Sequence, residues 1–128
     1  MHEKYHHGPR LPLEKDWREV IARTKWAVKE AGFKVPRLRF YFYMAVTYTD
    51  VMGEIRPLDG YCDFNNTYTT IRIVGSKPVT ETILHEVTHA VLEPIENSLA
   101  DHHSPTFWTV LGQITQQYDE KGGPYPDE

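Results

Sequence analysis

The residues best suited to chemistry are two histidines and a glutamate in the segment His85-Glu86-Val87-Thr88-His89. This is an H-E-x-x-H pattern, and on a helix its two imidazoles lie on one face, where both can bind the same zinc ion. Glu86 lies at the edge of that face, within reach of a water molecule on the metal. Zinc lowers the pKa of water and a carboxylate accepts the released proton, so the pattern predicts metal-assisted hydrolysis.

A helix from about Pro78 to Leu92 is expected to carry this pattern. Proline suits the first helical position because its missing N–H would be unpaired there, and Pro94 lies just past the expected end. Four apolar residues fall roughly opposite His85: Ile83, Val87, Ala90 and Val91. They would anchor the helix in the core and leave the histidines facing a cleft. This division disfavours the alternative of two surface histidines beside a solvated glutamate.

A catalytic zinc site also needs a third protein ligand and an open position for water. The candidates downstream of the helix are Glu93, Glu96, Asp101, His102 and His103. Residue type alone does not decide which of these five is the third ligand.

The segment at residues 103–108, His-Ser-Pro-Thr-Phe-Trp, resembles the H-G-P-x-F-W signature of the SprT-like, YgjP-like and WLM group of zinc metallopeptidases. In that group the histidine before the last helix completes a three-histidine zinc site. The resemblance therefore implies that Zn²⁺ is bound by His85, His89 and His103, with Glu86 as the general base. Ser104 stands where the group usually has glycine, and serine is a good N-cap for the following helix.

The resemblance extends over residues 38 to 118, because Leu58–Asp63 and Thr70–Val74 look like the group's hairpin before the active-site helix. It implies a zincin-like metallopeptidase whose peptide substrate lies along the edge strand, here Thr69–Val74. An open strand edge can bind an extended peptide through main-chain hydrogen bonds. No zinc ribbon with paired cysteines follows, as it does in SprT, which weakens the expectation of a DNA-linked function.

Hydrophobic periodicity predicts an α+β fold with a helix, a three-stranded antiparallel sheet, the active-site helix and a C-terminal helix. The expected elements are a helix over 13–31, a strand over 39–49, a loop with Gly53 and Pro57, a hairpin of strands 60–64 and 69–74, and a helix from Ser104 and Pro105 to Gly122. The C-terminal helix has an apolar stripe of Phe107, Val110, Leu111, Ile114 and Tyr118. Residues 1–10 are expected to be an unstructured tail, and 11–128 a single domain.

Charge is unevenly distributed along the 128 residues. Residues 1–40 hold ten Lys and Arg against five Asp and Glu, whereas residues 41–128 hold four against thirteen. The basic part is compatible with a nucleic-acid contact, but the acidic remainder disfavours a general nucleic-acid binder. No apolar run approaches the length of a membrane helix, and a single cysteine, Cys62, excludes an intrachain disulfide. A reduced, cytoplasmic protein is therefore expected.

Two other functions compete with the peptidase. In the first, the zinc site is structural and the domain recognises a peptide or a partner. A purely structural site, however, has no use for Glu86. The second is metal-dependent nucleic-acid processing, as in the three-histidine ribonucleases of the YbeY type. Their third histidine follows sooner than His103 does here, and their motif lacks the glutamate.

Several residues near the motif stay without an assigned role. Tyr61, Tyr68, Tyr118 and His102 are candidates for stabilising the oxyanion of hydrolysis, although a structural role is the favoured interpretation of each. Asp101 is a candidate acceptor for a hydrogen bond from a ligating imidazole. Cys62 is interpreted as a small, half-buried side chain of a strand.

Overall fold

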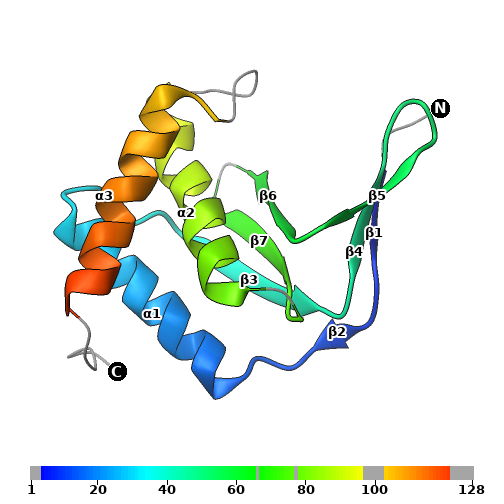
Figure 1. Ribbon diagram of the computed structural model, residues 1–128, viewed down its shortest axis with the longest axis horizontal. Helices are drawn as coiled ribbons and strands as arrows, with labels where there is room; N and C mark the ends of the chain where they lie inside the picture. Colours follow the sequence, from blue (N-terminus) through cyan, green and yellow to red (C-terminus); the bar gives the residue numbers. More distant parts are fainter. Residues whose placement is uncertain (1–3, 66, 77, 97–102, 122–128) are drawn as a thin grey trace.

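The computed structural model describes residues 4–65, 67–76, 78–96 and 103–121. The mixed α+β class is confirmed within these residues (Figure 1). The helices are α1 (Lys15–Glu30), α2 (Val79–Glu96) and α3 (Pro105–Lys121). The strands are β1 (Lys4–His7), β2 (Arg10–Leu11), β3 (Leu38–Tyr43), β4 (Val46–Thr49), β5 (Ile55–Leu58), β6 (Gly60–Phe64) and β7 (Thr69–Val74).

The strands form two sheets instead of the single three-stranded antiparallel sheet expected. The larger sheet has the order β2-β3-β7-β6, and its central pair, β3 and β7, is parallel. The smaller sheet has the order β1-β4-β5 and is antiparallel throughout. The three helices gather at one side of the larger sheet, and the smaller sheet projects away from them (Figure 1). We refer to the larger sheet with α1, α2 and α3 as the body.

The predicted strand over 39–49 is wrong because the chain changes sheets in its middle. β3 ends at Tyr43 and β4 begins at Val46. Between them, the Met44 N–H donates to the Pro9 carbonyl and the Ala45 carbonyl accepts from the Gly8 N–H. A continuous run of aromatic and β-branched residues hides such a break, since both strands favour the same residue types.

The residues around Pro57 are also a strand, β5, where a loop was expected. Proline lacks the N–H that a central strand needs, but β5 lies at an edge of the smaller sheet, where a proline is tolerated.

The expected unstructured tail is likewise wrong for the described residues of 1–10. β1 pairs with β4 in the register Lys4↔Thr49 to His7↔Val46, and β2 pairs with β3. The tail is polar, so its order comes from main-chain pairing and ring contacts that a hydrophobic pattern does not reveal. The Tyr5 ring, for example, stacks on Tyr61 with centroids 4.0 Å apart.

The hairpin of β6 and β7 is confirmed, but β7 is not an edge strand. It lies between β3 and β6, so β6 forms this edge of the larger sheet. The Val74 N–H donates to Asp59 and the Asn65 N–H donates to Tyr68, at the two ends of the ladder. Because pairing alternates along an antiparallel strand, the main-chain groups of Gly60, Cys62 and Phe64 point away from β7, toward the open edge.

The helices bury the apolar faces that the sequence predicts. On α2 the residues opposite His85 are all buried: Ile83, Val87, Ala90 and Val91. Three of them, Ile83, Val87 and Val91, belong to one core with residues of the sheet and of α3: Phe42, Ile71, Ile73, Phe107 and Ile114. The predicted end of α2 is wrong, since the helix continues through Pro94 to Glu96; a proline this near the end removes only one helical hydrogen bond. None of the described helices is long and apolar enough to span a bilayer.

Candidate metal centre

Three histidines converge where the middle of α2 faces the start of α3. His85 and His89 come from α2, and His103 lies two residues before α3. One ring nitrogen of each histidine lies within 4.8 Å of the corresponding nitrogens of the other two. The Nε2 atoms of His85 and His103 are 3.1 Å apart. The three predicted ligands are therefore close enough to bind one metal ion.

Phe107 forms the floor of this cluster. Its ring is only 1% exposed, and its centroid lies 4.4 Å from His89, 4.9 Å from His85 and 5.1 Å from His103. The rotation of each imidazole is therefore limited by the same buried ring. This ring also ties the site to the core, because Phe107 packs with α1, α2 and the sheet in one cluster.

The start of α3 positions His103. The Phe107 N–H donates to Ser104 Oγ at 3.2 Å, so Ser104 is the predicted N-cap. Pro105 occupies the first helical position, as expected. Trp108 stacks on His103 with ring centroids 5.6 Å apart, and Trp108 is 53% exposed. His103 thus contacts one buried ring, Phe107, and one exposed ring, Trp108.

The protonation state of His85 favours metal binding. Burial lowers the pKa of His85, and the nearby His103 lowers it further. A neutral imidazole keeps the lone pair that a metal ligand must donate. Within the described ranges no other histidine, cysteine or acidic side chain joins the three. Three protein ligands leave coordination positions for water or substrate, which is typical of a catalytic centre.

Glu86 is buried beside the histidines and lines the same cavity. Desolvation raises the pKa of its carboxyl to about 7, and a hydrogen bond from Cys62 partly opposes this rise. A carboxyl that titrates near neutral pH is well matched to accepting and returning a proton. The pattern correctly placed Glu86 next to the ligand face, but its near-complete burial depends on the strand packed against α2.

Cys62 is the site residue whose role the sequence did not reveal. Its Sγ lies 2.9 Å from Glu86 Oε1 and 3.2 Å from the Glu86 carbonyl oxygen. Burial raises the pKa of the thiol well above its usual value, with the Glu86 charge as a further cause. The protonated thiol can therefore donate to the carboxylate. The hairpin register puts Cys62 on one face of β6, but only the packing of β6 against α2 shows that this face meets Glu86.

The cavity at the histidines has a volume of about 470 Å³ and extends to the smaller sheet. Its lining includes Gly60, Tyr61, Cys62 and Phe64 of the edge strand, and Tyr5, Tyr48 and Leu58 of the smaller sheet. Burial raises the pKa of Tyr61 to about 12, and its protonated hydroxyl hydrogen-bonds with His7 Nε2. The sequence did not point to Tyr5 and Tyr48, because Tyr5 lies in the segment expected to be an unstructured tail and Tyr48 in a strand that the pattern did not separate from β3.

The other predicted candidates lie elsewhere. Tyr68 contacts Arg39, whose guanidinium carbon is 3.7 Å from the ring centroid, and lines a different hollow with Glu93. Tyr118 is buried in the core on α3, beside Arg23. Asp101 and His102 lie outside the described residues, as does the side chain of Glu96.

The body and its three-histidine cluster define a mixed α+β domain with a candidate metal centre. Comparisons of the chain with protein-family models, curated proteins and solved structures found no match. The function of the chain is therefore inferred from the residues of the candidate metal centre and from their geometry.

Proposed function

We propose that this chain is a zinc-dependent peptidase. The observation that carries the proposal is a cluster of three imidazoles with a buried carboxylate in the same cavity. This combination of a three-ligand centre and an adjacent acid–base group is what metal-assisted hydrolysis requires. The resemblance of residues 103–108 to zinc metallopeptidases supports the same conclusion.

The donor set suits zinc. Imidazole nitrogen is a preferred ligand of this ion, with Zn–N distances of about 2.0–2.1 Å. Two such ligands in a tetrahedral site are roughly 3.4 Å apart, as follows from those distances. The separation of 3.1 Å between the Nε2 atoms of His85 and His103 is close to that value. When bound, zinc would supply Lewis acidity, which acidifies water and polarises the scissile carbonyl.

The chain's own residues supply the proton transfers. Glu86 accepts a proton from the attacking water while the water oxygen forms a bond to the carbonyl carbon of the peptide. The same carboxyl then gives that proton to the amide nitrogen, the C–N bond breaks, and the products are an acid and an amine. Cys62 donates to Oε1 of Glu86, which restricts how the carboxylate can turn.

A peptide fits the surroundings of the site better than a compact ligand does. The main-chain groups of β6 that point outward belong to Gly60, Cys62 and Phe64, and these three residues also line the cavity. An extended peptide paired with this edge would therefore lie along the histidines. We therefore propose that the peptide pairs with β6. The sequence had indicated the neighbouring strand, Thr69–Val74, for this role.

The test combines metal analysis with a peptidase assay on denatured casein. Glu86→Gln is expected to retain one zinc per chain and to lose about 10²–10⁴-fold in hydrolysis, since it removes the acid–base group. His103→Ala is expected to lose the metal. His6→Ala is the matched control, because His6 is exposed on β1 and outside the cluster. Unchanged hydrolysis by Glu86→Gln would refute the mechanism, and a zinc-loaded but inactive wild type would favour a structural site.

The N-terminal histidines should be substituted instead of deleted in this experiment. Deleting them would remove β1, which pairs with β4, and would break the contact between His7 and Tyr61. Replacing His2 and His6 by alanine lowers adventitious metal binding and leaves the smaller sheet in place.

A further inference from the structure

The cavity at the metal centre has two chemically different sides. One side carries His85, Glu86, His89 and His103. The other side is formed by Tyr5, Tyr48, Leu58 and Tyr61, which we call the aromatic wall. The proposed hydrolysis uses the first side and assigns no role to the wall.

Ring contacts order the aromatic wall. Tyr5 stacks on Tyr61 at an interplanar angle of 9°, and the Tyr48 ring lies 5.1 Å from Tyr5. The Tyr61 hydroxyl is held by His7. Tyrosine offers a large contact area with few rotatable bonds, so a wall of this kind binds another side chain at a low cost in conformational entropy.

The wall stands beside the strand edge that would hold a peptide. Gly60, Cys62 and Phe64 turn their main-chain groups toward this edge, whereas Tyr61 turns its own toward β7. A peptide residue opposite Tyr61 would therefore form a non-hydrogen-bonded pair with it. In such pairs the side chains lie on the same face of the sheet and close together. That residue would direct its side chain to the aromatic wall.

The chemistry of the wall selects an apolar side chain. None of its four residues carries a charge at neutral pH, and the pKa of Tyr61 is about 12. The guanidinium group that contacts Tyr61, that of Arg72, is ion-paired with Asp63. An acidic substrate side chain would lose its hydration here without gaining a free cation, whereas an apolar one would bury surface that is otherwise wet.

We propose that the aromatic wall is a specificity subsite for an apolar, preferably aromatic, side chain of a peptide that pairs with β6 beside the metal centre. This inference rests on the proposed peptidase function, whose substrate class it narrows. Peptides with a phenylalanine or leucine near the scissile bond would be favoured over otherwise identical peptides with serine or aspartate at that position.

Binding to an inactive variant tests the subsite without relying on hydrolysis. The probes are fluorescently labelled peptides of glycine and serine in which one phenylalanine is moved along the sequence, and fluorescence anisotropy with zinc-loaded Glu86→Gln reports affinity. We expect the best phenylalanine peptide to bind at least about tenfold more tightly than the all-serine parent, as the burial of one large apolar side chain allows. Equal affinities would overturn the proposal.

Substitutions assign the preference to the wall. When Tyr48→Ala is added to Glu86→Gln, the preference for the phenylalanine peptide over the all-serine parent should fall to within about threefold, because apolar contact is lost. Tyr48→Phe should keep the preference because the ring remains. Tyr41→Ala is the matched control, since Tyr41 contacts Arg10 and lies outside the cavity lining. If Tyr48→Ala fails to fold by circular dichroism, Leu58→Ala replaces it. A preference that survives in whichever of the two variants folds would also refute the subsite.

The same peptides separate this inference from the proposed function. If Glu86→Gln prefers phenylalanine peptides but wild type cleaves none of them, the subsite stands and the peptidase proposal fails. If wild type cleaves phenylalanine and serine peptides equally well, the peptidase proposal stands and the subsite fails.

Discussion

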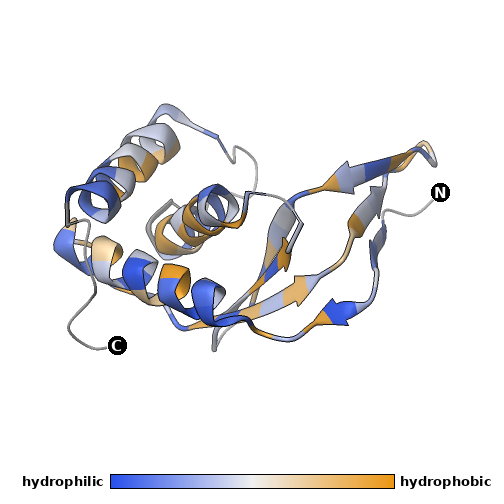
Figure 2. Cartoon of the chain, turned by 60° about the horizontal axis from the view of Figure 1, so that its bottom comes forward, coloured by the Kyte–Doolittle hydropathy of each residue, from blue (hydrophilic) through white to orange (hydrophobic). Residues whose placement is uncertain are grey.

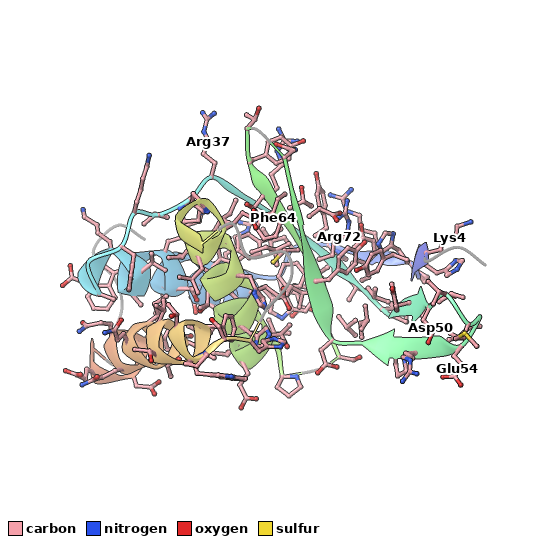
Figure 3. All side chains as sticks on the ribbon, turned by 90° about the horizontal axis from the view of Figure 1, so that it is seen from above. Lys4, Arg37, Asp50, Glu54, Phe64 and Arg72 are labelled. Atoms are coloured by element: carbon pink, nitrogen blue, oxygen red, sulfur yellow. The ribbon has the colours of Figure 1, made fainter. Side chains whose placement is uncertain are left out.

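The two sheets of this protein differ in what stabilises them and in what they contribute to the site. The larger sheet is covered by helices, and its central side chains Phe42, Ile71 and Ile73 are almost completely buried. The smaller sheet meets the larger one at a minor core of Val46, Tyr61 and Val74, with Tyr43 and Leu58 packed against it. Its β4–β5 hairpin ends in a tip where Val51 and Met52 are exposed, and Asp50 and Glu54 mark the far end of the molecule (Figure 3).

This contrast distinguishes a rigid region, which carries the candidate metal ligands, from a less tightly packed region, which carries most of the aromatic wall. The candidate metal ligands lie on or beside helices whose opposite faces are in the main core, so their positions are set by many contacts. Three residues of the aromatic wall, Tyr5, Tyr48 and Leu58, lie on the short strands of the smaller sheet, which has little core behind it. Figure 2 shows apolar residues at the exposed hairpin tip, far from the helices. Catalysis needs fixed distances between groups, whereas a binding surface can adapt to its ligand. The larger core therefore lies behind the metal ligands and the smaller core behind the binding surface.

The largest effect on stability is expected from removing the floor of the metal centre. Phe107→Ala should destabilise the metal-free protein by about 3–5 kcal/mol, because it leaves a cavity in the core. Urea unfolding measures this change. Trp108→Ala is the matched control on the same helix, and its exposed ring should cost under about 1 kcal/mol. Similar losses for the two variants would show that the body is not the rigid region described here.

A smaller, pH-dependent effect is expected from the Glu86 carboxyl, which is buried beside the site. The pKa of Glu86 is raised from 4.5 to about 7, so the folded, metal-free protein binds this proton more tightly than the unfolded chain. The resulting stabilisation is complete below pH 4.5 and is lost as the pH rises through 7.

Glu86→Gln removes this titration. Relative to the variant, metal-free wild type should therefore lose up to about 3 kcal/mol of unfolding free energy between these pH values, at 1.36 kcal/mol per pKa unit. Unfolding by urea at a series of pH values measures the difference. Parallel stability profiles for the two proteins would mean that the carboxyl is not desolvated as the structure indicates.

The smallest effect is expected at the tip of the smaller sheet. Met52 is 79% exposed, so Met52→Ser should change the unfolding free energy by no more than about 0.5 kcal/mol. Thermal unfolding of the two proteins measures this. A loss comparable to that of Phe107→Ala would break the comparison, since it would show the tip to be a structural part of the fold.

Much of the body could be predicted because its elements have strong local signals. The β6–β7 hairpin, the apolar face of α2 and the Ser104 cap of α3 all follow from turn residues, helical periodicity and capping chemistry. The smaller sheet could not be predicted in the same way. Its strands are short and polar, and β5 even contains Pro57, so pairing with distant residues decides their structure.

The sequence by itself determined which residues could hold a metal, because four-residue spacing on a helix brings His85 and His89 to one face. It also indicated His103, through the resemblance of residues 103–108 to a zinc metallopeptidase signature. Only the tertiary structure decided that Cys62 contacts Glu86 and that Tyr5, Tyr48 and Leu58 share a cavity with the histidines. Local spacing fixes angles within one element, whereas contacts between strands and helices depend on how separate elements pack, which no periodicity encodes.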